Sequence, residues 1–278
     1  MKIFRLLLIV LLVIGCSLVT PKPTNVIEEK QIYKEKPIEI PKKTIYVATK
    51  PEPSKVIPPA QKNIPKPEVP QNSLQFFPFI NELLDLKWET LRTRSVIPSV
   101  VEQETCITLK HKSCWNPQAQ LKTSREYGFG LGQLTIAYNA NGTERFNNFM
   151  EIKKFDSELK KWQWSDRFNP KYQLRALIVQ YRNHYNSIKW TDDELNRLAF
   201  ADSAYNGGLG GVLQDRKKTA TNGGNPNLWF GNNNVAANSY KAKITTSGYG
   251  KSFYQINREH VNNVLNIRRF KYIPYVEK

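Results

Sequence analysis

The stretch of sequence that decides the fold runs from Glu104 to Gln133 and reads ETCITLKHKSCWNPQAQLKTSREYGFGLGQ. It begins with a glutamate and ends in a glycine-rich turn over residues 128–133. Around its start, apolar residues recur at the spacing of one helix face, and the glutamate continues that series: Ile97, Val100, Val101, Glu104. The spacing predicts a helix with Glu104 on its apolar face and Glu102 on the opposite face, toward water.

A carboxyl group on the buried face of a helix is poorly solvated. Burial of this kind raises the pKa of a carboxyl and keeps it protonated near neutral pH, which is the state that a general acid needs. The alternative is a structural glutamate that forms an ion pair with Arg92 or Arg94. The stretch by itself leaves both interpretations open.

Composition limits the class of partner. The chain has 278 residues, enough for one or two domains, and 41 Lys and Arg against 24 Asp and Glu give it a net charge of +17. Such a charge favours polyanions, among them nucleic acid, anionic lipid and acidic cell-wall polymers. The sequence has neither a basic run interleaved with aromatic residues nor zinc-finger spacing, so we expect no nucleic-acid partner.

The N-terminus has the pattern of an export signal. Lys2 and Arg5 precede an apolar run over 6–14 that is too short for a comfortable membrane span. The run ends in Val-Ile-Gly-Cys16, which resembles the bacterial lipobox. That resemblance implies cleavage after residue 15 and a lipid anchor on Cys16, and Ser17 implies sorting to the outer membrane, facing the periplasm. An ordinary signal peptide or an uncleaved anchor is the alternative.

Residues 16–73 have the composition of a flexible linker. Eleven of the 17 prolines lie between residues 20 and 72, together with many lysines and no period long enough to build a core. An extended proline-rich chain of this length reaches on the order of 150 Å. We therefore predict a tether between a lipid anchor and a globular domain over 74–278.

Two further cysteines, Cys106 and Cys114, lie close together in a chain with an export signal. Oxidising compartments favour pairing of such cysteines, so a disulfide is predicted. The alternative is a metal site formed with His111, but it offers three ligands and no obvious fourth. We expect neither a metal nor a cofactor.

The globular part is predicted to be mainly α. Apolar residues at helical spacing mark several helices: Ile80, Leu83, Leu84, Trp88 and Leu91; then Leu174, Leu177, Ile178 and Tyr181; then Leu195, Leu198, Ala199 and Tyr205; finally Ile256, His260, Val264 and Ile267. Gly207 and Gly208 are expected to end the third of these helices, and residues 221–234 have the Asn and Gly content of a loop. Signals for β-strands are few.

Together these pieces resemble the soluble lytic transglycosylase family, which has a lysozyme-like fold and is related to goose-type lysozymes. The first family motif, Glu-Ser followed by Asn-Pro, is matched by Glu104-Thr105 and Asn116-Pro117, with the two-cysteine loop inserted. The second, Ser followed by Gly-Leu-Met-Gln, is matched by Ser124 and residues 130–133, with Gly132 in place of Met.

The third and fourth motifs follow in the same order. Ala-Tyr-Asn-Ala-Gly is matched by residues 204–208, and Asp166-Arg-Phe-Asn-Pro170 resembles the entry to the preceding helical pair. The fourth motif aligns around His260, where the family has a tyrosine, or Tyr254 reaches in instead. The match covers about residues 90–268. The residues that fill the motifs most resemble those of transglycosylase-like proteins of bacteriophage or mobile elements.

The resemblance implies that Glu104 is the single catalytic acid. It would cleave the MurNAc–GlcNAc β-1,4 bond of peptidoglycan without water and leave a 1,6-anhydroMurNAc end, with the substrate acetamido group in place of a second carboxylate. The resemblance also implies the sugar-binding residues: Gln133, Tyr205, Asn206, Gly130, Tyr127, Trp115 and His260. Gly128, Gly130 and Gly132 would let backbone approach the sugar, and Trp162, Trp164 and Trp229 would stack on it or pack in the core.

Two other functions are compatible with the sequence. A hydrolytic muramidase would need a second carboxylate across the site, for which Glu126, Asp166 and Asp202 are candidates. An inactive, lipid-anchored wall-binding protein would keep the fold but would not need Glu104, Gln133 and the Tyr205-Asn206 pair together.

Overall fold

The computed structural model describes residues 68–231 and 250–277. The chain divides into two units, Met1–Ala60 and Gln61–Lys278, and everything described below belongs to the second. The predicted signal peptide, Cys16 and nearly all of the predicted linker lie outside the described residues.

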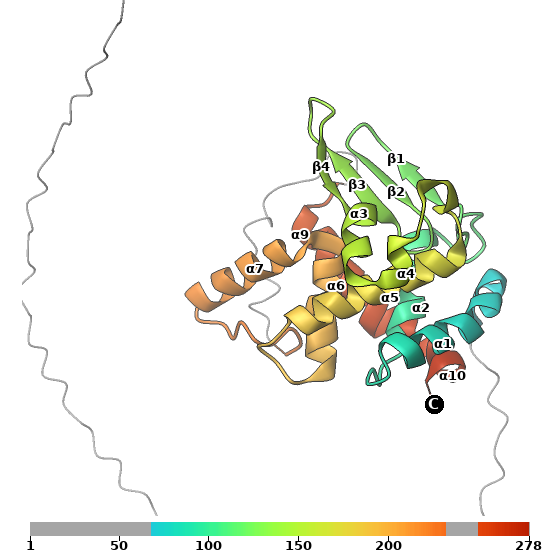
Figure 1. The fold of residues 1–278 in the computed structure, drawn as a ribbon. Helices are drawn as coiled ribbons and strands as arrows, with labels where there is room; N and C mark the ends of the chain where they lie inside the picture. The colour runs from blue at the N-terminus through green and yellow to red at the C-terminus, as the bar shows by residue number, and fades with distance from the viewer. Residues whose placement is uncertain (1–67, 232–249, 278) are drawn as a thin grey trace, which may run out of the picture. The chain divides into compact units, whose positions relative to one another are not determined.

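The described part of the chain is mainly helical, as predicted, with one small sheet (Figure 1). Before the sheet come η1 (Gln71–Phe76), α1 (Phe77–Lys87) and α2 (Val96–Thr105). The strands are β1 (Gln120–Lys122), β2 (Glu126–Phe129), β3 (Leu134–Tyr138) and β4 (Glu144–Asn147). Four short helices follow: α3 (Asn148–Ile152), η2 (Lys153–Phe155), α4 (Ser157–Lys160) and η3 (Trp164–Asp166).

The remaining elements are helices. They are α5 (Pro170–Ser187), α6 (Glu194–Gly207), α7 (Leu209–Thr221), α9 (Phe253–Asn262), the π-helix η5 (Asn263–Arg268), η6 (Arg269–Tyr272) and α10 (Ile273–Val276). In Figure 1 the strands gather on one side of the helices, beside α3 and α4.

Local sequence explains where the long helices begin and end. The side chains of Asn169 and Asp193 accept backbone hydrogen bonds at the starts of α5 and α6, and Ser252 forms a capping box with Gln255 at the start of α9. α6 ends at Gly207 and is capped by Gly208, whose φ of 83° favours glycine, as the sequence predicts.

Helix α2 lies in the middle of the main core. It packs against α1, η5 and η6, and residues 96–102 and Thr105 are all buried. The apolar side chains around it come from both ends of the domain: among them Ile80, Leu84, Leu177, Leu198, Val264 and Tyr272. A helix enclosed in this way has no single buried face, and this decides the environment of its glutamates.

The four strands form an antiparallel sheet in the order β1-β2-β3-β4. Phe129 pairs with Leu134 across the β2–β3 connection, so the predicted glycine-rich turn is a hairpin loop. One face of the sheet packs on a second apolar cluster: Phe129, Leu134, Phe149, Ile152, Leu159, Trp162, Ala176 and Val179. The sequence analysis missed the sheet because its strands are short and the outer ones, QLK and ERFN, are polar and mostly exposed.

The predicted C-terminal helical stripe holds only in part. His260 and Val264 are buried, whereas Ile267 is 59% exposed. The reason is the π-helix after Asn262, whose wider turn shifts which side chains face the core, and Leu265 is buried there. Among the described residues, no helix combines the length and apolar character needed to cross a membrane.

Candidate active site

The environments of Glu102 and Glu104 are the reverse of those predicted. Glu102 is fully buried, whereas the side chain of Glu104 is 18% exposed. The prediction assumed a helix with one buried face, but α2 is enclosed by neighbours on several sides. Its neighbours bring to Glu102 the charges that a buried carboxylate requires.

Glu102 is the structural glutamate of this helix. Its Oε1 accepts from Arg268 and, at 2.9 Å, from Lys271, and its Oε2 accepts from the hydroxyl of Tyr272. The predicted alternative, an ion pair of Glu104 with Arg92 or Arg94, does not form: Arg92 pairs with Glu194 and Arg94 with Asp85. Glu102 therefore fixes η5 and η6 against α2.

Glu104 is the first member of a chain of three ionisable side chains from three helices. Its Oε1 lies 2.8 Å from Nε2 of His260 in α9, and Nδ1 of the same ring lies 2.8 Å from Oδ2 of Asp202 in α6. Asp202 is fully buried and also accepts from the hydroxyl of Tyr181 in α5, at 3.2 Å. Of the three, Glu104 is the most exposed.

The two carboxylates set the charge of the imidazole. Burial by itself lowers the pKa of His260, but the charges of Asp202 and Glu104 and their hydrogen bonds outweigh it and raise that pKa to about 10. The ring is therefore an imidazolium at neutral pH, and both nitrogens donate. With 5% exposure and both nitrogens bonded to carboxylates, His260 has no group left for a sugar, so its predicted role in binding substrate is wrong.

Tyr205 lies beside this chain of residues. Its hydroxyl donates to the carbonyl oxygen of Gly132 at 2.5 Å. Burial, followed by the charges of Glu104 and Asp202, raises the pKa of this hydroxyl well above its ordinary value. The third motif thus joins a neutral hydroxyl to the hairpin loop, and the charge of Glu104 acts on this hydroxyl.

Asn206 is exposed, and the oxygen of its side-chain amide is fixed by a hydrogen bond. Its Oδ1 accepts from Nδ2 of Asn257 at 3.0 Å, and Asn257 is in turn held by Ser203. Arg258 donates to Asn257 and pairs with Asp215 of α7. This network fixes the third motif against α9, the helix that carries His260.

The glycines of the hairpin loop accommodate protein side chains. All three are buried, so the prediction that their backbone approaches a sugar is wrong, for Gly130 in particular. Gly130 has φ of 76°, and a Cβ there would lie 2.4 Å from the side chain of Gln173. A Cβ at Gly132, where the family has Met, would lie 2.7 Å from the hydroxyl of Tyr205.

Gln133 stands at the end of the loop with φ of 44°. Its amide nitrogen donates to the carbonyl oxygens of Gly130, at 2.9 Å, and Ala119, at 3.3 Å. The side chain is half-buried, so it stabilises the turn and still presents part of its amide to the surface.

Gln173 is an organising residue that the sequence analysis missed. It is fully buried in α5, its Oε1 accepts from the backbone of Leu131, and its Nε2 donates to the carbonyl oxygens of Pro117 and Arg167, each at 2.8 Å. One amide thus joins the first motif, the hairpin loop and the segment before α5. Its position on an apolar helical face, one residue before Leu174, was the available signal.

The aromatic candidates separate by exposure. Trp115 is 1% exposed and Trp162 is fully buried, so both are core residues and the predicted binding role of Trp115 is wrong. Trp115 packs against Phe76, with 5.8 Å between ring centroids. Tyr127 is half-buried, and its ring lies 5.9 Å from that of Trp164, which is 42% exposed. These two rings remain available to a sugar.

The disulfide predicted between Cys106 and Cys114 is present, with an S–S distance of 2.03 Å. It closes a loop that begins directly after α2, two residues beyond Glu104. The hydroxyl of Thr105 accepts from the backbone of Trp115, so the loop is joined to the helix a second time. No group of residues suited to holding a metal ion occurs in the part of the chain that the structure describes.

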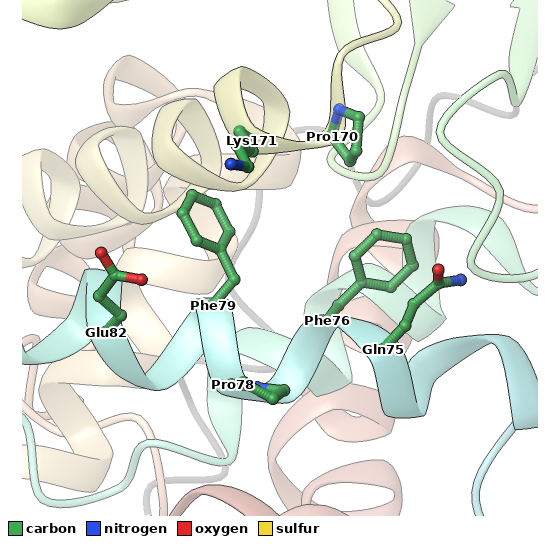
Figure 2. A pocket seen from close by; sticks show the side chains of 7 residues that line it. All are labelled: Gln75, Phe76, Pro78, Phe79, Glu82, Pro170 and Lys171. Carbon is green, nitrogen blue, oxygen red and sulfur yellow. The ribbon is translucent and has the colours of Figure 1, made fainter.

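A pocket of about 420 Å³ lies elsewhere, between η1, α1 and the start of α5 (Figure 2). It is lined by Gln75, Phe76, Pro78, Phe79, Glu82, Pro170 and Lys171. None of the residues around Glu104 lines it, and the ammonium group of its Lys171 lies 5.9 Å from the centre of the Phe79 ring. The linked ionisable side chains of the candidate active site therefore lie around Glu104 and not in this pocket.

A mainly helical domain whose central helix presents a partly exposed glutamate is consistent with the lysozyme-like transglycosylase class that the motifs predict. No family model matches the chain. Over 161 residues, 58% of its length, the chain is 31% identical to the membrane-bound lytic murein transglycosylase F of Yersinia enterocolitica and 30% identical to that of Yersinia pestis.

The protein of the same name from Vibrio parahaemolyticus is 30% identical over 107 residues, 38% of this chain. The chain covers 28% of the two Yersinia proteins and 20% of the Vibrio protein, so it spans less than a third of the length of these relatives. These similarities support a distant relationship to lytic murein transglycosylases.

Proposed function

We propose that the chain is a peptidoglycan lytic transglycosylase in which Glu104 is the single catalytic carboxyl. The observation that carries this proposal is the placement of Glu104. Its side chain is partly exposed, and its Oε1 is hydrogen-bonded to His260. The charge of Glu104 also acts on the hydroxyl of Tyr205. The names of the relatives give the reaction class, and the four motifs give the residues.

The proposed reaction has two proton transfers, both at Glu104. The protonated carboxyl first gives its proton to the glycosidic oxygen between MurNAc and GlcNAc, and the C1–O bond breaks. The acetamido group of the substrate stabilises the positive charge that develops at C1. The Glu104 carboxylate then takes the proton of the muramic C6 hydroxyl, whose oxygen bonds to C1, and a 1,6-anhydro ring forms without water.

The surroundings of Asp202 favour this route over hydrolysis. Of the three carboxylates considered as a base for water, Asp202 is fully buried and is engaged by His260 and Tyr181. It has no path to a water molecule on a sugar. Glu126 and Asp166 are more exposed, but among the described residues neither forms a side-chain hydrogen bond or ion pair with the residues around Glu104, so a single-carboxyl mechanism fits the site better.

Several predicted binding residues keep a role in the proposal. Tyr205 holds its hydroxyl on the carbonyl oxygen of Gly132, where the charge of Glu104 acts on it. Asn206 presents its exposed amide to an N-acetyl group, and the half-buried Gln133 bonds to sugar. Tyr127, with the neighbouring Trp164, supplies a ring surface for a sugar face. Aromatic rings are suited to this because they combine large apolar area with a polar edge.

Digestion of purified sacculi tests the reaction. Soluble muropeptides are separated and weighed, and we expect products that end in 1,6-anhydroMurNAc. Products heavier by one water, with reducing muramic ends, would establish a hydrolytic muramidase instead. The absence of any product from a folded chain that still sediments with sacculi would establish the wall-binding protein.

The location proposed for the enzyme is the cell envelope, held by a lipid on Cys16 with the 16–73 linker as a tether. The relatives are called membrane-bound, and the lipobox-like sequence Val-Ile-Gly-Cys16 supports lipidation. Cys16→Ser should move the protein from the membrane fraction to the soluble periplasmic fraction. Retention of the Ser variant in the outer-membrane fraction would contradict the anchor.

A further inference from the structure

The most unusual feature of the site is a histidine between two carboxylates. The four motifs lead to a tyrosine at this place, which would offer Glu104 a neutral donor. The chain instead places His260 there, and it places Asp202, a fully buried carboxylate, behind the ring. Because a buried carboxylate is costly without a partner, the pair Asp202–His260 forms one unit in which each charge requires the other.

We propose that His260 and Asp202 are positioning residues for the proton transfers at Glu104. Asp202 fixes the ring through Nδ1, and the ring fixes Oε1 of Glu104 through Nε2, which leaves Oε2 as the oxygen that gives and takes the proton. This inference rests on the proposed function and assigns roles that the motifs of the chain do not contain.

The geometry supports each part of this arrangement. The two bonds of the ring are both 2.8 Å long and use both nitrogens, so the ring cannot rotate without losing one of them. Among the described residues, none forms a hydrogen bond with Oε2 of Glu104. Of the three linked side chains, that of Glu104 is the partly exposed one. Helix α9 is held in turn by its side chains, Asn257 on Ser203 and Arg258 on Asp215.

The charge of the ring gives the unit its chemical effect. When Glu104 gives up its proton, its carboxylate forms 2.8 Å from an imidazolium, which stabilises the negative charge at the moment it develops. The ring loses this charge as the pH rises through about 10, so its stabilising effect should be lost there. A neutral donor at position 260 would provide the hydrogen bond but not this effect.

The titratable groups around the ring come from three helices. Glu104 lies on α2 and Asp202 on α6, while Tyr181 of α5 and Tyr205 of α6 lie next to these carboxylates. Both tyrosines have raised pKa values, through burial first and then through the nearby carboxylates, so they remain neutral. The remaining carboxylate of α2, Glu102, has its own partners in η5 and η6.

The test measures the pH profile of anhydro-product release from sacculi, from about pH 4 to about pH 11. His260→Gln keeps a donor near Nε2 but removes the charge, and Asp202→Asn keeps an acceptor for Nδ1 but removes the second carboxylate. In each variant we expect the rate at the optimum to fall at least about tenfold. The part of the pH profile that reflects loss of the ring's charge near pH 10 should be absent in His260→Gln and should move to lower pH in Asp202→Asn, which removes one of the two carboxylates that raise the pKa of His260. The double variant should be no slower than the slower single variant, because the two residues act as one unit.

His184→Gln is the matched control. His184 lies on α5 outside the site, and burial lowers its pKa to about 4, so the substitution removes no charge at neutral pH. Its profile should superimpose on that of the wild type. His260→Tyr, which installs the residue that the motifs lead to, should recover part of the rate that His260→Gln loses, without the charge of the ring.

The outcomes separate the two proposals. A folded wild-type chain that releases no anhydro product overturns the proposed function, and this inference with it. A wild-type chain that releases the product, with variant profiles that keep the wild-type shape, overturns this inference alone. Should His260→Gln fail to fold by circular dichroism, Asp202→Asn and the NMR titration of the His260 ring decide: a ring in the wild type that loses its charge near pH 6.5 contradicts the proposed unit.

Discussion

At the scale of single residues, Glu102 and Glu104 show how the same side chain acquires two roles. They lie two positions apart on α2, yet Glu102 has three partners from η5 and η6 and Glu104 has one from α9. Both carboxyls need positive partners, and what differs is whether any surface is left for a substrate. Burial is complete for Glu102, and this leaves the partly exposed Glu104 as the candidate acid.

We expect Glu104→Gln to lose activity about a thousandfold or more on sacculi, because an amide cannot give or take the proton. Its melting temperature should stay near that of the wild type, since the Asp202–His260 pair remains intact. Product release and thermal melting by circular dichroism measure the two effects. Retention of more than about a tenth of the wild-type rate would show that another group is the acid.

Glu102→Gln should have the opposite profile. It leaves Arg268 and Lys271 beside a neutral amide, and removal of one partner from a buried ion pair costs about 3–5 kcal/mol. Urea unfolding measures the free energy of unfolding, and the rate per folded molecule should stay within about threefold of the wild type. A stable variant with no activity would exchange the roles of the two glutamates.

At the scale of elements, the hairpin loop between β2 and β3 is held by close packing at its glycines. Gly130→Ala should lower the free energy of unfolding by about 2–3 kcal/mol, because it combines a positive φ with a contact of 2.4 Å to Gln173. Gly142→Ala is the matched control: its φ is also positive, at 81°, but nothing lies within 4 Å of the added carbon. It should cost only about 1 kcal/mol. Equal losses in the two variants would mean that the contact with Gln173 does not matter.

The disulfide after α2 belongs to the same scale. Replacing both Cys106 and Cys114 by Ser opens a loop with a sequence separation of 8 and should cost about 2–3 kcal/mol in the free energy of unfolding. Addition of a reductant to the wild type should give the same loss. The rate of product release should also fall at temperatures where the protein stays folded. The reason is that Thr105 and Trp115 link this loop to the end of the helix that carries Glu104. Unchanged melting after reduction would contradict this account.

At the scale of the whole molecule, buried charges from distant parts of the chain make stability depend on pH. Asp156 forms ion pairs with Lys87 of α1 and Arg175 of α5, each at 2.8 Å. Burial opposes ionisation, but these partners and the backbone of Leu159 outweigh it and lower the pKa of Asp156 to about 2 from its ordinary 3.8. The stabilising contribution is therefore complete above pH 3.8 and is lost as the pH falls through about 2.

Thermal melting as a function of pH tests this. The wild type should lose melting temperature between pH 3.8 and pH 2 in excess of the loss shown by Asp156→Asn, which has no carboxyl to protonate there. Parallel curves for the two proteins over this range would show that Asp156 does not control acid stability.

The alkaline side depends on His260. Its folded-state pKa of about 10 lies above the ordinary value of 6.5, so its contribution is complete below pH 6.5 and is lost as the pH rises through about 10. We expect the wild type to lose melting temperature over this window and His260→Gln to lose less. The same measurement on His184→Gln should follow the wild type, and a wild type that keeps a constant melting temperature up to pH 10 would contradict the charged ring.

Sequence by itself determined the mainly helical class, the helix of Glu104, the end of α6 at Gly208 and the pairing of Cys106 with Cys114. These depend on local periodicity, on backbone preferences of glycine, and on cysteines close together in the chain. The order of the four motifs also pointed to the family with which the relatives agree.

Only the tertiary structure decided which glutamate is buried and what faces each one. Arg268, Lys271, His260 and Asp202 all lie far from α2 in sequence, and no local pattern shows which of them will meet Glu102 and which Glu104. Likewise, glycines predicted to approach a sugar prove to make room for Gln173 and Tyr205. The physical reason is that burial and charge are set by the sum of neighbours around a position, whereas periodicity reports only which side of one helix a residue occupies.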